Sequence, residues 1–229
     1  MRPLDHLFNG DIRSFLLSLL FILPALVIGI SFHEAAHAWM ADRMGDSTAR
    51  NLGRITLDPT KHFDLFGIIT FILIGFGWGK SVPTNPRNYT NYKKGNVLVA
   101  LAGVSMNMII ALITLIVISV LSLAGVFNGM LPNYNVLTLT SIIHIILYQI
   151  ASINLILCFF NLLPVPPLDG HHLVKGYIAR KSPAFFMTYM RYGFIALIIL
   201  MFAVPWFSTG LSFLVRSVIF GVGSLFGVI

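Results

Sequence analysis

The sequence predicts an α-helical polytopic membrane protein, with about five transmembrane helices and one re-entrant, β-hairpin-like membrane segment. The composition supports this class, because 57% of the 229 residues are hydrophobic and only 10% are charged. The mean hydropathy of +0.86 lies well above that of ordinary soluble domains. Several apolar runs also reach the roughly 20 residues that a helix needs to cross a bilayer.

The expected spans follow one another along the chain, and the fourth is shorter than the others. They cover residues 14–40, 97–126, 136–163, 194–206 and 208–229. The first span has no early cleavage site of small residues and is too long for a signal peptide, so we expect it to be retained. The single cysteine, Cys158, lies inside an apolar span, which excludes a disulfide framework.

Basic residues in the loops set the expected orientation. Lysine and arginine gather in the loops 42–64, 80–94 and 164–191, whereas the connection 125–136 carries none. By the positive-inside rule the three basic loops face the cytoplasm. The same distribution argues against nucleic-acid binding, because the net charge of +7 is divided among loops instead of following one face.

The segment 66–79, FGIITFILIGFGWG, lies between two loops assigned to the same side, so it cannot be a single crossing. It is also short for a transmembrane helix. Its β-branched and aromatic residues and its alternating glycines predict a re-entrant hairpin or short strands at the membrane edge. Because lipid cannot satisfy non-helical backbone, we expect a water-filled cavity nearby.

A constellation of ionisable side chains lies near the end of the first span, in the stretch FHEAAH. His33 and His37 are four residues apart, so on a helix they share one face and can bind the same ion. Glu34 lies close enough to contact a water on that ion without being a ligand. Random placement of the histidines and the glutamate would produce the pattern His-Glu-x-x-His about 0.001 times in a chain of this composition. The pattern predicts a zinc hydrolase site.

Catalytic zinc sites take three protein ligands and leave a position for water, so a third ligand is required. Asp169 is the one acidic residue after Asp64, and it follows a span that is expected to run inward. This puts it at the same membrane depth as His33 and His37. Pro164, Pro166 and Pro167 forbid a continuing helix, so we expect an extended, unwound end to this span.

Together, FHEAAH on a membrane helix and NLLPVPPLDG at the end of a later one resemble the site-2 protease family of intramembrane zinc metalloproteases. The resemblance covers most of the chain. It implies that His33, His37 and Asp169 bind one Zn²⁺ per chain and that Glu34 is the catalytic base, which activates the zinc-bound water. It also implies that the substrate is a transmembrane segment of another protein.

The resemblance extends to residues implied to contact the substrate. Gly77 lies in GFGWGK, which is similar to the family's membrane-edge strands, and Asn161 and Pro164 lie in the proline-rich motif. Gly103 and Asn107 match a family segment in which proline stands at the position of Val104. We therefore expect Gly77, Asn107, Asn161 and Pro164 to bind substrate.

The other polar residues have simpler interpretations. Asp42, Asp46, Asp58 and Asp64 are expected in loops and helix caps. His171 and His172 are expected to support the site or to lie at the interface instead of binding metal. His144, inside a span, is expected to hydrogen-bond a neighbouring helix.

The sequence thus predicts a single transmembrane protease domain over residues 1–229, with a catalytic core at about 14–170 and additional spans at about 190–229. We expect a multi-pass protein of the cell membrane, embedded in the lipid bilayer, with its site near the cytoplasmic face. A divalent-metal transporter and an inactive membrane scaffold are the alternatives. The sequence indicates neither the substrate nor the oligomeric state.

Overall fold

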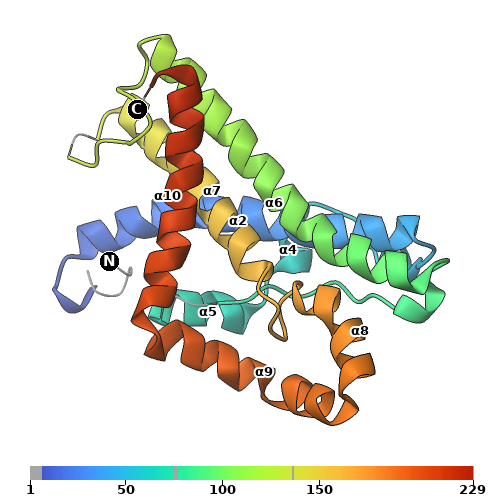
Figure 1. The fold of residues 1–229 in the computed structure, drawn as a ribbon. Helices are drawn as coiled ribbons and strands as arrows, with labels where there is room; N and C mark the ends of the chain where they lie inside the picture. Colours follow the sequence, from blue (N-terminus) through green and yellow to red (C-terminus); the bar gives the residue numbers. More distant parts are fainter. Residues whose placement is uncertain (1–6, 75–76, 136, 229) are drawn as a thin grey trace.

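The computed structural model describes residues 7–74, 77–135 and 137–228. This part of the chain is built from helices joined by turns and loops (Figure 1). In chain order the elements are α2 (Ile12–Arg43), α3 (Thr48–Asn51), α4 (Pro59–His62), α5 (Leu65–Ile74), the 3₁₀ helix η1 (Pro86–Asn88), α6 (Tyr92–Leu123), α7 (Leu139–Asn161), α8 (His171–Lys181), α9 (Pro183–Ala203) and α10 (Pro205–Phe226).

Five of the described helices, α2, α6, α7, α9 and α10, are long and apolar enough to cross a membrane. The structure thus has the five candidate membrane-spanning helices that the sequence predicted. The fourth begins at Pro183, earlier than the predicted residue 194. Ser182 caps this helix by accepting a hydrogen bond from the Phe185 N–H, and Pro183 suits the first turn, where its missing N–H is not needed.

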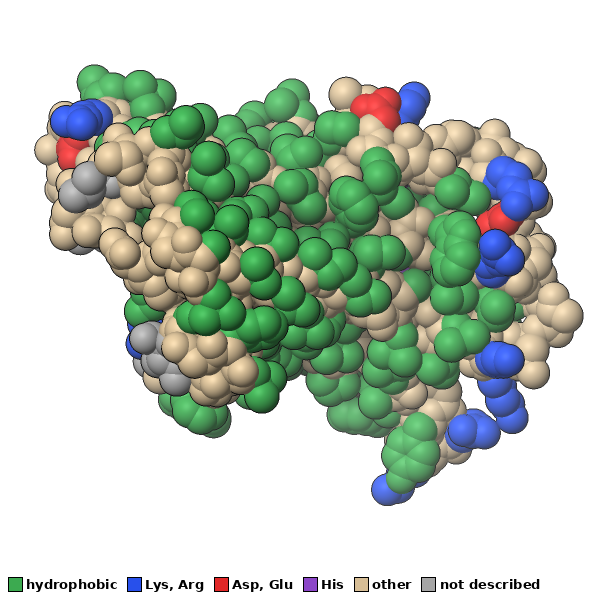
Figure 2. Space-filling model, turned by 90° about the horizontal axis from the view of Figure 1, so that it is seen from above, with side chains coloured by type: hydrophobic (Ala, Val, Ile, Leu, Met, Phe, Trp, Pro, Cys, Tyr) green, Lys and Arg blue, Asp and Glu red, His purple; other side chains and the backbone are tan. Residues whose placement is uncertain are grey.

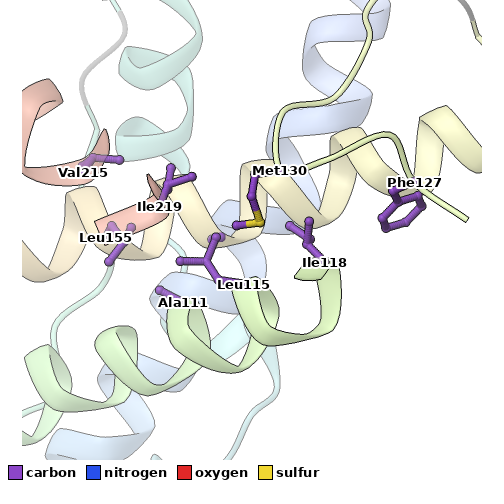
Figure 3. Packing of buried hydrophobic residues seen from close by; sticks show 9 residues of the cluster. Ala111, Leu115, Ile118, Phe127, Met130, Leu155, Val215 and Ile219 are labelled. Carbon is purple, nitrogen blue, oxygen red and sulfur yellow. The ribbon is translucent and has the colours of Figure 1, made fainter. Parts of the chain in front are cut away.

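The helices α2, α6 and α7 pack against one another, and α10 crosses in front of α7 (Figure 1). Their apolar core joins side chains of α6, α7 and α10 with two residues of the loop between α6 and α7 (Figure 3). Its central members are fully buried, as Leu115 of α6, Leu155 of α7 and Ile219 of α10 show. This packing holds α6, α7 and α10 together.

The prediction for the segment 66–79 is wrong over its first part, because residues 65–74 form the helix α5. A short, wholly apolar run cannot be assigned to strand or helix from its periodicity alone, and here the local capping favours helix. The Asp64 carboxylate accepts a hydrogen bond from the Gly67 N–H at 2.9 Å. The remaining described backbone, from Gly77 onward, makes one isolated antiparallel bridge between Phe63 and Gly79. Gly75 and Phe76 lie outside the described residues.

The end of α7 follows the sequence prediction in position but not in shape. The helix stops at Asn161, ahead of the prolines, as expected. Residues 162–170 then form a series of turns instead of an extended strand. The Gly170 N–H donates to the Asn161 carbonyl at 2.7 Å, which closes this loop onto the helix end and brings Asp169 back to it.

The surface has the distribution of a membrane protein. Apolar side chains cover the middle of the face seen in Figure 2, whereas lysine, arginine and acidic side chains gather toward its ends. Large apolar side chains are exposed along the spans, as Ile113 on α6 and Phe202 on α9 show. A bilayer is the environment in which such a surface is stable.

Candidate metal centre

Helix α2 presents His33, Glu34 and His37 within one turn, and all three are buried, with at most 9% of each residue exposed. The i, i+4 spacing brings the two Nε2 atoms to 3.0 Å from each other. No Lys or Arg of the described chain forms an ion pair with any of the three. Two imidazole nitrogens therefore face each other in a buried site.

Asp169 completes the group from the loop after α7. Its Oδ2 lies 3.1 Å from the His33 Nε2 and 3.2 Å from the His37 Nε2. The three candidate ligand atoms lie within 4.8 Å of one another. The structure thus brings together the two histidines and the aspartate that the sequence analysis predicted as ligands.

The tautomer of His37 is set by helix α6. The His37 Nδ1 lies 2.7 Å from the Val99 carbonyl oxygen, which can only accept, so Nδ1 carries the proton in the neutral ring. Its Nε2 is then the atom that is available to a cation. This orientation by a backbone carbonyl is the outer-shell arrangement typical of metal-bound histidine.

Gly103 provides the close approach of α6 to the two rings. A Cβ at this position would lie 2.5 Å from the His37 Nε2 and 2.7 Å from the His33 Nε2. Any side chain would therefore occupy the space in front of the two ligand nitrogens. A glycine is required here by space.

The charges fit a cation. Burial raises the pKa of the Asp169 carboxyl, but its contacts with His33 and His37 lower the pKa by more, so the net pKa lies below the ordinary value. Asp169 is thus an acceptor-only carboxylate beside two imidazoles. One oxygen and two nitrogen ligands, three in all, suit a zinc ion with one position open to water. His33, His37 and Asp169 therefore fit a zinc ion.

Glu34 lies beside this group and has its own partner. Its Oε2 accepts a hydrogen bond from the Val82 N–H at 2.8 Å. Val82 belongs to the connection between α5 and α6, so the carboxylate is held between two parts of the chain that are distant in sequence. This contact could not be predicted from the sequence, because the donor is a backbone group.

The residues predicted to contact substrate are spread over the site and its surroundings. Asn107 lies on α6 one turn after Gly103 and is fully buried, and neither of its amide atoms has a hydrogen-bond partner in the described structure. The Asn161 side chain bonds the Leu157 carbonyl of its own helix, and the Pro164 carbonyl accepts from the Tyr189 hydroxyl. Neither residue joins the ligand group.

Gly77 packs against α5. A Cβ at Gly77 would lie 2.2 Å from the Gly67 carbonyl oxygen. Gly77 also lines an apolar cavity of about 680 Å³ between α2, α5, α7 and α10. Ile30, one turn before Glu34, lies in the wall of the same cavity. The lining of this cavity is mostly apolar, and the water-filled cavity stays a prediction.

His144, His171 and His172 have other contacts. His144 lies 3.3 Å from the Met130 carbonyl through its Nε2 and stacks on Phe127, so it bonds a loop and not, as predicted, a helix. His171 is bonded to the Leu168 carbonyl through its Nδ1 at 2.7 Å, which supports the loop that carries Asp169. Burial, with His171 and Lys175 adding positive charge nearby, lowers the pKa of His172 to about 3.

Comparison with known proteins agrees with this geometry. YwhC of Bacillus subtilis (strain 168), named as a zinc metalloprotease, is 35% identical over 184 residues, which cover 79% of each chain. Rip2 of Mycolicibacterium smegmatis is 23% identical over 186 residues, and Rip2 of Mycobacterium tuberculosis is 24% identical over 192 residues. Both are also named as zinc metalloproteases. The matches cover 79% and 80% of this chain and 66% of each Rip2.

No solved structure matches the chain at a significant level. The family model of peptidase family M50 matches residues 21–202, and this match contains both motifs that provide the buried histidines and the aspartate. The chain is therefore a member of peptidase family M50.

Proposed function

We propose that this protein is a zinc metalloprotease that hydrolyses a peptide bond within or near a transmembrane segment of another membrane protein. The observation that carries the proposal is the buried convergence of His33, His37 and Asp169, with Glu34 in the same helical turn. The family and the names of the relatives support the same reaction.

His33 and His37 would hold the zinc ion through their Nε2 atoms, and Asp169 through Oδ2. When bound, zinc supplies Lewis acidity, which polarises the scissile carbonyl and lowers the pKa of a water molecule to about 7. In the neutral ring, the contact of Nδ1 with the Val99 carbonyl places the proton on Nδ1 and leaves the His37 Nε2 as the ligand atom. The Asp169 carboxylate offsets part of the cation's charge in a buried site.

Glu34 moves the proton. Its carboxylate accepts a proton from the attacking water and then returns it to the nitrogen of the leaving amine. No described residue hydrogen-bonds Oε1, whereas the Val82 N–H holds Oε2. We therefore assign the proton transfer to Oε1.

The substrate has to reach these groups from the lipid. The apolar cavity between α2, α5, α7 and α10 leads along α2 to Ile30 and suits an apolar segment. A helical segment must unwind before it is cut, because its carbonyl carbons are shielded and its amides are bonded. The buried, unpaired amide of Asn107 is suited to bind a freed backbone group of the unwound substrate.

The site is assigned to the cytoplasmic side of the cell membrane, and residues 1–229 are assigned to one protease domain. The loops 42–64, 80–94 and 164–191 hold most of the basic residues and connect the helix ends nearest the candidate ligands. Under the positive-inside rule these ends lie in the cytoplasm. A reporter fused after residue 130 is expected outside, and one fused after residue 88 inside.

The test of the proposed function compares wild type with Glu34→Gln. Both are purified in detergent, incubated with solubilised membrane proteins of the expression host, and analysed by mass spectrometry for new chain ends. Wild type should generate ends within transmembrane segments, and Glu34→Gln should generate none while keeping its zinc. Equal cleavage by both proteins would refute the role of Glu34, and zinc transport without cleavage would replace the protease by a transporter.

A further inference from the structure

The segment 79–88 approaches the site along the side of α2. It begins at Gly79, whose Cα is so close to α2 that a Cβ would lie 2.8 Å from the Ile30 side chain and 3.9 Å from the Glu34 Oε1. Three residues later the Val82 N–H reaches the Glu34 Oε2. The segment 79–88 therefore lies directly beside the Glu34 carboxylate.

The first half of this segment is fixed by backbone contacts. The Lys80 N–H donates to the His62 carbonyl at 2.8 Å, and Gly79 forms the bridge with Phe63. Arg54, which is 8% exposed, donates from Nη2 to the Lys80 carbonyl at 2.6 Å. A buried guanidinium that hydrogen-bonds a backbone carbonyl is unusual, because a buried positive charge is ordinarily paired with a carboxylate.

The second half is fixed by a buried carboxylate, that of Asp46. Its Oδ2 accepts from the Asn85 N–H at 2.6 Å and its Oδ1 from the Asn88 side chain at 2.9 Å. It also accepts from the Thr48 N–H, so it ties the segment to the start of α3. The residue is fully buried. Burial raises its pKa, but these hydrogen bonds lower it below the ordinary value, so Asp46 stays ionised.

Val82 itself is anchored from both sides. Its side chain packs with Ala38 of α2 and Ala49 of α3. Ala38 follows His37 directly, so the packing joins this segment to the turn of α2 that carries the ligands. The N–H of Val82 has little freedom to move away from Glu34.

We propose that the segment 79–88 positions the catalytic carboxylate, with the Val82 N–H as the direct donor to Glu34 and Asp46 as a positioning residue that anchors the segment. This inference rests on the proposed function, since it assigns a geometric support to the assigned base. A general base must be held within hydrogen-bond reach of its proton, and a displacement of about 1 Å can cost roughly 100-fold in rate. One fixed oxygen leaves the other directed to the water.

The structure offers a matched pair of variants at Val82. Val82→Pro removes the N–H, and Val82→Ala keeps the N–H while removing most of the side chain. With the host membrane protein that wild type cuts fastest, Val82→Pro should lower kcat about 10- to 100-fold. Its KM and its zinc content should stay near those of wild type. Val82→Ala should lose less than about threefold in kcat, since the donor remains.

Hydrogen exchange supplies a readout that needs no substrate. In the full chain, the peptide containing the Val82 amide should exchange slowly in wild type. It should stay protected in Glu34→Gln, because glutamine keeps an acceptor oxygen. In Glu34→Ala the same amide should exchange about tenfold faster or more. Equal protection in all three proteins would show that Glu34 does not hold this amide and would overturn the inference.

Asp46 has a matched control in Asp58. Asp58 accepts from the Thr60 N–H and hydroxyl much as Asp46 does from Thr48, but it is exposed and lies at the start of α4. Asp46→Asn cannot accept from both the Asn85 N–H and the Asn88 side chain in the same geometry. It should therefore speed exchange in peptides of 80–88 and lower kcat about 3- to 10-fold with zinc retained. Asp58→Asn should change neither.

The outcomes separate this inference from the proposed function. If Val82→Pro keeps the wild-type kcat while Glu34→Gln is inactive, the base stands and its positioning by the segment is refuted. If Glu34→Gln cleaves as wild type does, the proposed function fails, whatever hydrogen exchange shows at Val82. A loss of zinc in Val82→Pro would assign the segment to metal binding and would also overturn the positioning role.

Discussion

The helices α6 and α9 differ in how they serve the candidate site. Within the apolar window of each span, 39% of the residues of α6 are buried and 11% of those of α9. Helix α6 touches the candidate ligands themselves, through the Val99 carbonyl on His37 and through Gly103 against both rings. Helix α9 packs against α8 and α10 and reaches the site only through the loop that carries Asp169. Substitutions in α6 at its contacts with the histidines should therefore affect zinc binding more than substitutions in α9 do.

The contact of α9 with this loop has two parts. The Tyr189 hydroxyl donates to the Pro164 carbonyl at 3.0 Å. Gly193 packs against the Pro166 ring, where a Cβ would lie 2.7 Å from the Pro166 Cδ. The loop that carries Asp169 thus packs against α9, a helix that is otherwise mostly exposed.

The largest effect is expected at Gly103. In Gly103→Ala the added methyl group lies in front of the His33 and His37 nitrogens, so zinc content should fall to near zero and cleavage should cease. Metal analysis of the purified protein measures this. Gly176→Ala on α8 is the control, because a Cβ there meets nothing within 4 Å. Full zinc content in Gly103→Ala would refute the close approach of α6.

A large effect on stability is expected in the core of α6. Leu115 is fully buried between α6, α7 and α10. Leu115→Ala should lower the free energy of unfolding by about 2 kcal/mol through lost packing. Ile113, which is 57% exposed on the same helix, provides the control Ile113→Ala. Equal losses of thermal stability in detergent for both variants would contradict the assigned core.

A moderate effect is expected at Gly193 on α9. In Gly193→Ala the loop around Pro166 must shift, because the proline ring is not a flexible end. Zinc affinity should fall about 3- to 30-fold, while the fold and the two histidines stay in place. Competition with a chelator of known affinity measures the change. A loss as complete as that of Gly103→Ala would remove the distinction between the two helices.

The smallest effect is expected at Tyr189. Tyr189→Phe removes one hydrogen bond to the Pro164 carbonyl and leaves the ring in place. The loss should be about 0.5–1.5 kcal/mol in stability, with zinc content unchanged. Thermal unfolding compared with wild type measures it. Loss of zinc from this variant would show that the loop depends on α9 more than its contacts indicate.

The helices and the ligand group could be predicted from the sequence for physical reasons. Span length is fixed by bilayer thickness, and the i, i+4 spacing of His33 and His37 is a local property of one helix. Asp169 could be assigned because the sequence offers no other acid after Asp64. The structure brings these side chains together, and their role as ligands stays a prediction.

The supporting groups could not be predicted, because they are backbone atoms. The Val99 carbonyl and the Val82 N–H are present at almost every residue, and only the tertiary fold selects them. The helix α5 was missed because its apolar run suits a strand as well as a helix. Asp46 was predicted only as a loop or cap residue, and its contacts with Asn85 and Asn88 depend on long-range packing.

Metal analysis of Asp169→Ala tests the central claim most directly. Wild type and the control Asp58→Ala should each hold about one zinc ion per chain, since Asp58 is an exposed helix cap whose carboxylate bonds Thr60. Asp169→Ala should hold little or none while its hydrogen exchange along α2, α6 and α7 stays that of wild type. Unchanged zinc in Asp169→Ala would contradict a centre formed by His33, His37 and Asp169.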